Sequence, residues 1–258
     1  MLEPAISCLL RAILPGHGTR IKGWRVTAIM NDKSRSIDED KQLAADAAVA
    51  EVQEGMLIGL GTGSTAAYAI RAIGRAGIAI EAVATLEVSA QLARKVGIKI
   101  IDFSRVERVD LTIDGADEID EGLRAIKGAG GAMLREKIVA AASDRMVVIA
   151  DSSKRVETIG VAKLPVEIVP FATAYVSAAL RPMFDAVDLR DEGRVLTDSG
   201  NVVLDCMNSH SDDWDRLAGF LSTVPGVVGH GLFLSEVDAA YIASEGIVTR
   251  LERRLTSG

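Results

Sequence analysis

The feature that most constrains the fold is a regular alternation of short apolar segments and helical segments between residues 38 and 150. Each apolar segment has the length of a strand, and each helical segment carries hydrophobic residues three or four positions apart. This alternation is typical of strand–helix–strand units, in which neighbouring strands run parallel and the crossovers are right-handed. The expected strands are 56–60, 78–84, 98–101, 110–113 and 146–150, and the expected helices are 38–55, 61–75, 87–96 and one from residue 132.

The hydrophobic composition agrees with such a sheet. Hydrophobic residues make up 48% of the 258 residues, but aromatic residues only 4%. Ala, Val, Ile and Leu must therefore fill the core, as they do in parallel sheets that are covered by helices on both faces. We predict an α/β fold with a doubly wound, mostly parallel, Rossmann-like sheet.

The pattern changes after residue 162. Expected strands at 166–169, 186–189 and 202–206 and helices at 173–184 and 213–221 are joined partly by tight turns, which favours antiparallel pairing. Segments 239–243 and 247–251 are expected to return to the first sheet. The predicted domains are a catalytic α/β domain of residues 38–162 plus 237–258 and a smaller α+β subdomain of residues 163–236, inserted near the C-terminus.

The first 37 residues are distinctly basic. They hold six basic and two acidic side chains, although the whole chain has a net charge of −7. We expect a basic, poorly ordered N-terminal extension. A transit peptide and an over-long reading frame that naturally starts at Met30 are the alternatives.

Composition also excludes several classes of partner. The charge of −7 argues against nucleic acid or an anionic membrane, and no apolar run is long enough for a membrane span. Cys8 and Cys206 lie far apart, which fits a reducing cytoplasm and no disulfide framework. His17, His210 and His230 lack metal-ligand spacing, so we expect no metal.

A hydroxyl-rich glycine loop follows the first expected strand. In GLGTGSTAAYAI, the residues Thr62, Gly63, Ser64 and Thr65 open a helix, where free N–H groups and the helix dipole favour anions. The segment lacks the third glycine and the ribose-binding acid of a dinucleotide fingerprint, and it lacks the Gly-Lys-Ser/Thr ending of a P-loop. We interpret it as a cup for one phosphate; the alternative is a tight turn capped by Ser and Thr.

Further polar residues follow the ends of other strands. Ligands of doubly wound sheets bind beyond the carboxyl ends of the strands, and the loops that begin at residues 61, 85, 114 and 151 all lie there. We therefore expect one shared site. Its other candidates are Asp114, Gly115, Ala116 and Asp117 in a turn, Lys127, Gly128, Ala129 and Gly130 in a loop, and Lys154 after a strand. The alternative is turn-forming aspartates and solvated lysines.

Glu136 is the candidate general base. Leu134, Ile138 and Ala141 form an apolar stripe on its helix, and Glu136 is expected roughly opposite them, without an ion-pair partner three or four residues away. A partly buried carboxylate of this kind has a raised pKa, which suits a base that works near neutral pH. The alternative is a solvated surface glutamate.

Together these segments resemble ribose-5-phosphate isomerases of the type A family, over residues 38–254. The resemblance rests on GLGTGSTA, TIDGADEID, KGAGGAMLREKIVA, DSSK and PGVVGHGLF. It implies an aldose–ketose isomerase that interconverts ribose 5-phosphate and ribulose 5-phosphate through an enediolate, without metal or cofactor, as a homodimer or homotetramer in the cytoplasm.

The resemblance also implies roles for the candidate residues. Glu136 would move the proton between C2 and C1, and Asp114 and Lys127 would assist at the sugar oxygens. The remaining candidates would hold the phosphate and the hydroxyls. Leu86 and Ala129 depart from the family pattern, because a hydroxyl residue and a glycine are usual there. A sugar-phosphate deaminase or lactonase, or a non-catalytic sugar-phosphate sensor, would be the alternative functions.

Overall fold

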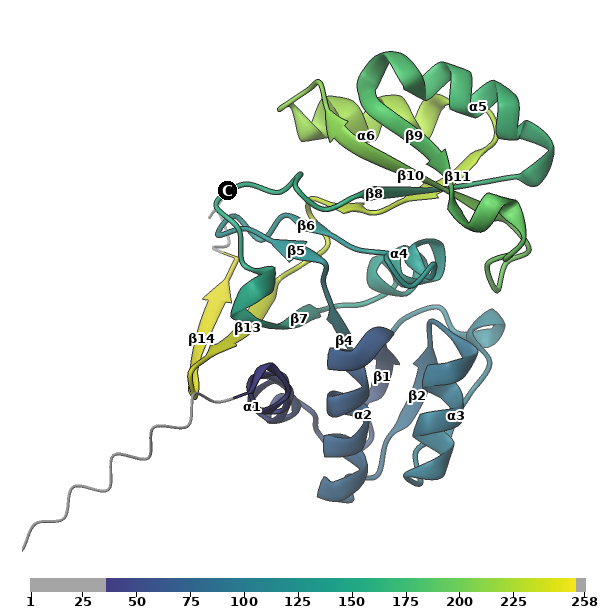
Figure 1. Cartoon of the computed structure of the whole chain (residues 1–258). Helices are drawn as coiled ribbons and strands as arrows, with labels where there is room; N and C mark the ends of the chain where they lie inside the picture. The colour runs from purple at the N-terminus through teal and green to yellow at the C-terminus, as the bar shows by residue number, and fades with distance from the viewer. Residues whose placement is uncertain (1–35, 254–258) are drawn as a thin grey trace, which may run out of the picture. The chain divides into compact units, whose positions relative to one another are not determined.

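The computed structural model describes residues 36–253, so residues 1–35 of the predicted N-terminal extension lie outside the described part. A seven-stranded sheet has the order β14-β13-β7-β4-β1-β2-β3 (Figure 1). Its pairs are parallel except for β13 with β14, which confirms the predicted mostly parallel sheet. The strands are β1 (Leu57–Leu60), β2 (Glu81–Ala84), β3 (Lys99–Ile100), β4 (Leu111–Gly115), β7 (Met146–Asp151), β13 (Ala239–Ser244) and β14 (Ile247–Glu252).

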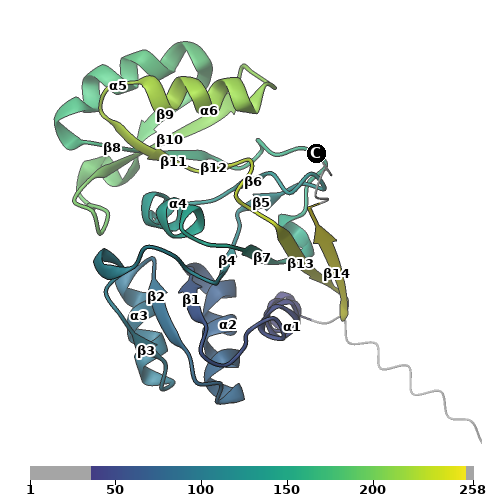
Figure 2. The ribbon, with the colours of Figure 1, turned by 180° about the vertical axis from the view of Figure 1, so that it is seen from behind.

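The two faces of this sheet are covered differently (Figure 2). Helices α1 (Ile37–Val49), α2 (Gly63–Ala76) and α3 (Glu87–Lys95) pack on one face around an aliphatic core. Helix α4 (Met133–Ala141) and a small antiparallel sheet, with the order β12-β6-β5, pack on the other face. The small sheet consists of β5 (Glu118–Ile119), β6 (Ala125–Ile126) and β12 (Leu232–Phe233).

The helix boundaries follow local chemistry. Ser36, rather than the expected Asp38, caps α1: its hydroxyl accepts from the Glu39 N–H, and the Glu39 carboxylate accepts from the Ser36 N–H in return. Helix α2 is followed by Gly77 at φ +65°, and α3 is followed one residue later by Gly97 at φ +86°. Both glycines take up the left-handed conformation that ends helices.

A second, four-stranded antiparallel sheet has the order β11-β8-β10-β9. It consists of β8 (Leu164–Ile168), β9 (Phe184–Leu189), β10 (Val202–Ser209) and β11 (Val227–His230). Its outer face carries α5 (Thr173–Leu180) and α6 (Trp214–Thr223), and α4 lies on its other side (Figure 1).

The helix predicted over 173–184 is four residues too long, because α5 ends at Leu180, a 3-10 turn follows over Arg181–Met183, and Phe184 already belongs to β9. Pro182 explains the early end, since it has no N–H to continue the helical ladder.

The division into domains stays a prediction. Residues 36–253 fall within one compact unit, and the four-stranded sheet is built entirely from the predicted subdomain 163–236. Within the described residues, no helix combines the length and the hydrophobicity that a membrane crossing requires.

Candidate active site

Glu136 lies on the buried face of α4. It is only 3% exposed and shares this face with Met133, Val139 and Ala140, whereas Ile138 is 45% exposed. The predicted apolar stripe of Leu134, Ile138 and Ala141 is therefore not the face that packs on the large sheet, although Glu136 does lie opposite it.

Helix α4 has a protein neighbour on two sides. A side chain at Gly59 of β1 would meet Val139 Cγ1 at 2.7 Å, and one at Gly229 of β11 would meet Leu134 Cδ1 at 3.2 Å. A helix between two sheets carries apolar residues on both sides, and periodicity alone does not tell which side is buried more deeply.

Three buried charges meet at the carboxyl end of β4. The Lys127 Nζ lies 2.8 Å from Asp114 Oδ2 and 3.3 Å from Glu136 Oε2. It also donates to the carbonyl oxygen of Gly115 at 2.5 Å. The structure thus brings together the three predicted catalytic residues, which come from a strand end, a loop and a helix.

Asp114 is fixed by the glycine loop of β1. Its Oδ1 accepts from the Thr62 N–H at 3.0 Å and from its neighbour Gly115 at 2.7 Å. A side chain at Gly61 would meet the same Oδ1 at 1.8 Å, so this position tolerates only glycine. The other carboxylate oxygen, Oδ2, is left to face Lys127.

The backbone of Lys127 is held from the β12 side. Its N–H donates to the Gly231 carbonyl at 2.9 Å, and a side chain at Gly231 would meet the Lys127 carbonyl at 2.2 Å. The buried Phe233 ring lies 5.5 Å from the Lys127 ammonium and 4.0 Å from that of Lys137, within cation–π range. The PGVVGHGLF segment therefore holds both the backbone and the ammonium group of Lys127 in place.

In the loop after Lys127, glycines occupy the positions at which the backbone has a positive φ. Gly128 and Gly131 have φ of +101° and +78°. Ala129 has no positive φ, so the substitution that departs from the family pattern costs no backbone strain. Its N–H donates to Asp117 Oδ2 at 2.9 Å, which ties this loop to the acidic turn.

Burial dominates the electrostatics of Glu136. Desolvation, followed by the charge of Asp114, raises the pKa of its carboxyl to about 8, although the nearby Lys127 opposes the shift. Burial alone would lower the pKa of Lys127, but the two carboxylates outweigh it and raise that pKa above its ordinary value. The ammonium therefore stays charged, while Glu136 can exchange a proton near neutral pH.

A cavity of about 180 Å³ opens against this cluster. Its wall contains every predicted substrate-binding residue except Asp114, which lies beneath it and contacts Lys127. Lys154 reaches the wall from a turn of residues Ser152–Lys154, which begins where Asp151 accepts from the Ser153 N–H at 2.9 Å. The lining residues are Lys41, Thr62, Gly63, Ser64, Thr65, Gly115, Ala116, Asp117, Lys127, Gly128, Ala129, Gly130, Glu136 and Lys154.

Sequence reasoning missed Lys41. It comes from α1 and lies 3.6 Å from Asp38, one turn earlier in the same helix. An (i, i+3) pair of opposite charges is ordinary on a helix surface, so no sequence signal set this lysine apart. The cavity therefore has two ammonium groups, Lys41 and Lys154, in addition to the buried Lys127.

Comparison with known proteins agrees with this geometry. The family model described as Ribose 5-phosphate isomerase A (phosphoriboisomerase A) matches residues 81–246. Ribose-5-phosphate isomerase A of Sphingopyxis alaskensis is 48% identical over 214 residues, which cover 81% of this chain and 94% of that protein. The chain belongs to the ribose 5-phosphate isomerase A family.

Solved structures of ribose 5-phosphate isomerases share the fold. The ribose 5 phosphate isomerase A of Neisseria gonorrhoeae has a TM-score of 0.82 and 36% identity, covering 85% of this chain and 99% of that one. A D-ribose-5-phosphate isomerase in complex with phospho-erythronic acid has a TM-score of 0.80 and 33% identity, covering 85% and 100%. These matches support the α/β fold of this family member.

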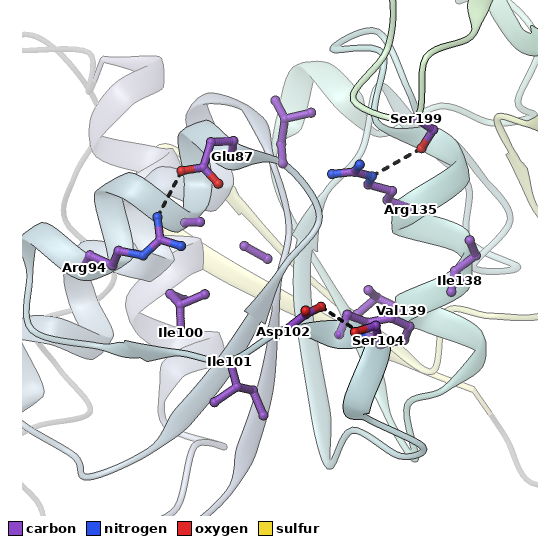
Figure 3. Close-up of a pocket in the computed structure, with 14 residues that line it drawn as sticks. Glu87, Arg94, Ile100, Ile101, Asp102, Ser104, Arg135, Ile138, Val139 and Ser199 are labelled. Carbon is purple, nitrogen blue, oxygen red and sulfur yellow. Dashed lines mark hydrogen bonds and ion pairs between the residues drawn. The ribbon is translucent and has the colours of Figure 1, made fainter.

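This member of the ribose 5-phosphate isomerase A family has a larger cavity, of about 700 Å³, between α3 and α4 (Figure 3). Its wall combines aliphatic side chains with polar and charged ones, and its two arginines, Arg94 and Arg135, are paired with Glu87 at 3.0 Å and with Asp198 at 3.3 Å. Leu86 lines this cavity and not the smaller one. Of the four loops expected to share one site, the loop that begins at residue 85 is therefore absent from the lining of the smaller cavity.

Residues 36–253 contain no group of three or more His, Cys, Asp or Glu side chains that could hold a metal ion. The carboxylates of the site, Asp114 and Glu136, instead face the ammonium of Lys127.

Proposed function

We propose that the protein interconverts ribose 5-phosphate and ribulose 5-phosphate, with Glu136 as the base that moves one proton between C2 and C1. The observation that carries this proposal is the buried cluster of Asp114, Lys127 and Glu136 against a small polar cavity. A buried carboxylate with a raised pKa is the form of base that such a reaction needs. Family membership supports the same reaction.

The reaction is an internal redox reaction that balances without a cofactor. In the open-chain aldose, the Glu136 carboxylate takes the proton from C2, the electron pair forms the C1–C2 double bond, and the aldehyde oxygen becomes an enediolate oxygen. The proton of the C2 hydroxyl then moves to the oxygen on C1. Glu136 returns its proton to C1, and the oxygen on C2 becomes the ketone.

Lys127 and Asp114 serve the sugar oxygens in this scheme. The buried ammonium stabilises the negative charge that develops on the enediolate, where exclusion of water strengthens the interaction. Asp114 keeps Lys127 in place at 2.8 Å and keeps it protonated. A base of this kind contributes about 10²–10⁴-fold, and positioning and electrostatics must supply the rest.

We expect the phosphate of the ligand to bind in the part of the cavity away from Glu136, beside the start of α2. Thr62, the residue before α2, makes no side-chain capping bond, so its hydroxyl is available to a ligand rather than used as a helix cap. The first N–H groups of α2 favour an anion, and Lys41 and Lys154 supply positive charge. We assign the phosphate to this side and the reacting carbons to Glu136.

The test is conversion with isotope exchange. Purified protein with ribose 5-phosphate in D₂O that contains a chelator should form ribulose 5-phosphate and place solvent deuterium on the carbon that receives the proton. Absence of ketose, or activity that disappears with the chelator, would contradict the proposal.

The remaining assignments stay predictions. We propose that residues 163–236 form a separate subdomain. We also propose that the protein works in the cytoplasm as a homodimer or homotetramer. Sedimentation velocity of the purified protein tests the oligomeric state.

A further inference from the structure

Arg190, which directly follows β9, reaches the glycine loop of the active site. Its Nη1 donates to the carbonyl oxygen of Ala129 at 3.1 Å and to that of Gly128 at 3.3 Å. These two residues line the cavity that contains Glu136. A residue of the four-stranded sheet region therefore contacts the loop that carries Lys127.

The guanidinium is held in place by Asp205 of β10. Its Nε lies 3.2 Å and 3.1 Å from the two carboxylate oxygens, and its Nη2 pairs with the same group. Asp205 is only 8% exposed. Because side chains alternate along a strand, Asp205 lies on the opposite face from Leu204 and Cys206, which pack under α5 and α6. The ion pair thus belongs to the inner face of the sheet.

The backbone after Arg190 is unusual. Asp191 and Glu192 have φ of +48° and +55°, and Gly193 follows at +73°. Two consecutive non-glycine residues in the left-handed region are costly, and such conformations persist where the surrounding structure enforces them. This left-handed turn begins immediately after the residue that contacts the loop.

The contact fixes how the loop presents its peptide groups. In a trans peptide the C=O and the following N–H point in opposite directions. With the carbonyls of Gly128 and Ala129 turned toward Arg190, the N–H groups of Ala129 and Gly130 point away from it. The Ala129 N–H donates to Asp117, whereas that of Gly130, a cavity-lining residue, donates to no group among residues 36–253.

We propose that Arg190, held by Asp205, is a positioning residue that orients the loop of residues 127–131, so that the Gly130 N–H faces a ligand oxygen. The role of the ligand rests on the proposed function, but the orientation of the loop does not. Arginine is required because one planar group must bridge a carboxylate and two carbonyl oxygens at once. A lysine has a single ammonium and cannot span both.

The test compares R190M with R194M. Arg194 lies on the same turn, is largely exposed and pairs only with Glu192 among the described residues, so R194M removes an equal charge without touching the loop. We expect R190M to raise KM for ribose 5-phosphate about 10- to 100-fold, the usual effect of losing hydrogen bonds to a charged group. Because bound substrate selects the correct loop conformation, kcat should change by less than about threefold, and the pH profile should not move. R190K should recover only part of the loss.

Hydrogen exchange provides a readout that does not depend on activity. In R190M, amides of residues 128–131 should exchange faster than in the wild type, while R194M should match the wild type. Unchanged exchange and unchanged KM in R190M, or equal changes in R194M, would overturn the proposal. A wild-type protein that fails to convert ribose 5-phosphate would refute the proposed function instead, and the exchange comparison would still decide the role of Arg190.

Discussion

Replacement of Lys127 by Met should destabilise the protein and make its stability strongly dependent on pH. With an effective dielectric constant of about 20, the contacts of its ammonium at 2.8 Å and 3.3 Å correspond to about 6 and about 5 kcal/mol of gross attraction. Most of this is offset by the cost of burying the charges. Removing one partner of a buried cluster leaves the other charges uncompensated and typically costs about 3–5 kcal/mol, so we expect a loss of this size near pH 8.

The sign of the pH dependence follows from the carboxylates. Lys127 lowers the pKa of Glu136, so its removal raises that pKa further. A carboxyl whose pKa is raised in the folded state destabilises the fold at a pH above its unfolded value, and protonation removes the penalty. The loss of stability in K127M should therefore shrink as the pH falls from 8 to 5.

Urea unfolding followed by circular dichroism at several pH values measures this directly. K154M is the matched control, because Lys154 lines the same cavity but is only partly buried and forms no ion pair within residues 36–253. Its stability should stay within about 0.5 kcal/mol of the wild type. A loss below about 1 kcal/mol in K127M at pH 8, or a loss that grows toward pH 5, would refute the reasoning about the buried cluster.

Three further predictions concern activity. The kcat/KM for ribose 5-phosphate should rise with pH as Glu136 ionises, with a midpoint near its pKa of about 8, and a midpoint at the ordinary glutamate value of 4.5 would contradict this origin. Gly61→Ala should lower both stability and kcat, because the new Cβ would lie 1.8 Å from Asp114 Oδ1. The control G219A should behave like the wild type, because no atom lies within 4 Å of a Cβ at that position. Equal effects of the two substitutions would refute the predicted clash. Lys41→Met should raise KM about tenfold at nearly constant kcat, and an unchanged KM would remove Lys41 from the phosphate side.

The parallel sheet could be predicted because its signals are local. Segments such as 56–60 and 146–150 are apolar runs between a helix stop and a polar loop, and β1 and β7 lie there. The topology then places the ends of β1, β4 and β7 at one edge. The rule that ligands bind beyond the carboxyl ends of parallel strands therefore predicted correctly that Thr62, Asp114 and Lys154 lie at one site, although they are far apart in the chain.

The parts that could not be predicted depend on contacts between distant segments. The strands β5, β6 and β12 have two residues each, too few for a periodic pattern. The degree to which Glu136 is buried depends on which of the two sheets packs against each side of α4. Lys41 and Arg190 reach the site from elements that carry no motif of their own. Such residues become visible only when the chain is folded.

The central claim is that Glu136 carries the proton, and the E136Q variant tests it most directly. Glutamine keeps the shape of the side chain but cannot act as a base. We predict that E136Q still binds ribose 5-phosphate, as measured by calorimetry, yet turns it over at least about 10²-fold more slowly than the wild type. Near-normal turnover by E136Q would contradict the assignment of Glu136 as the base.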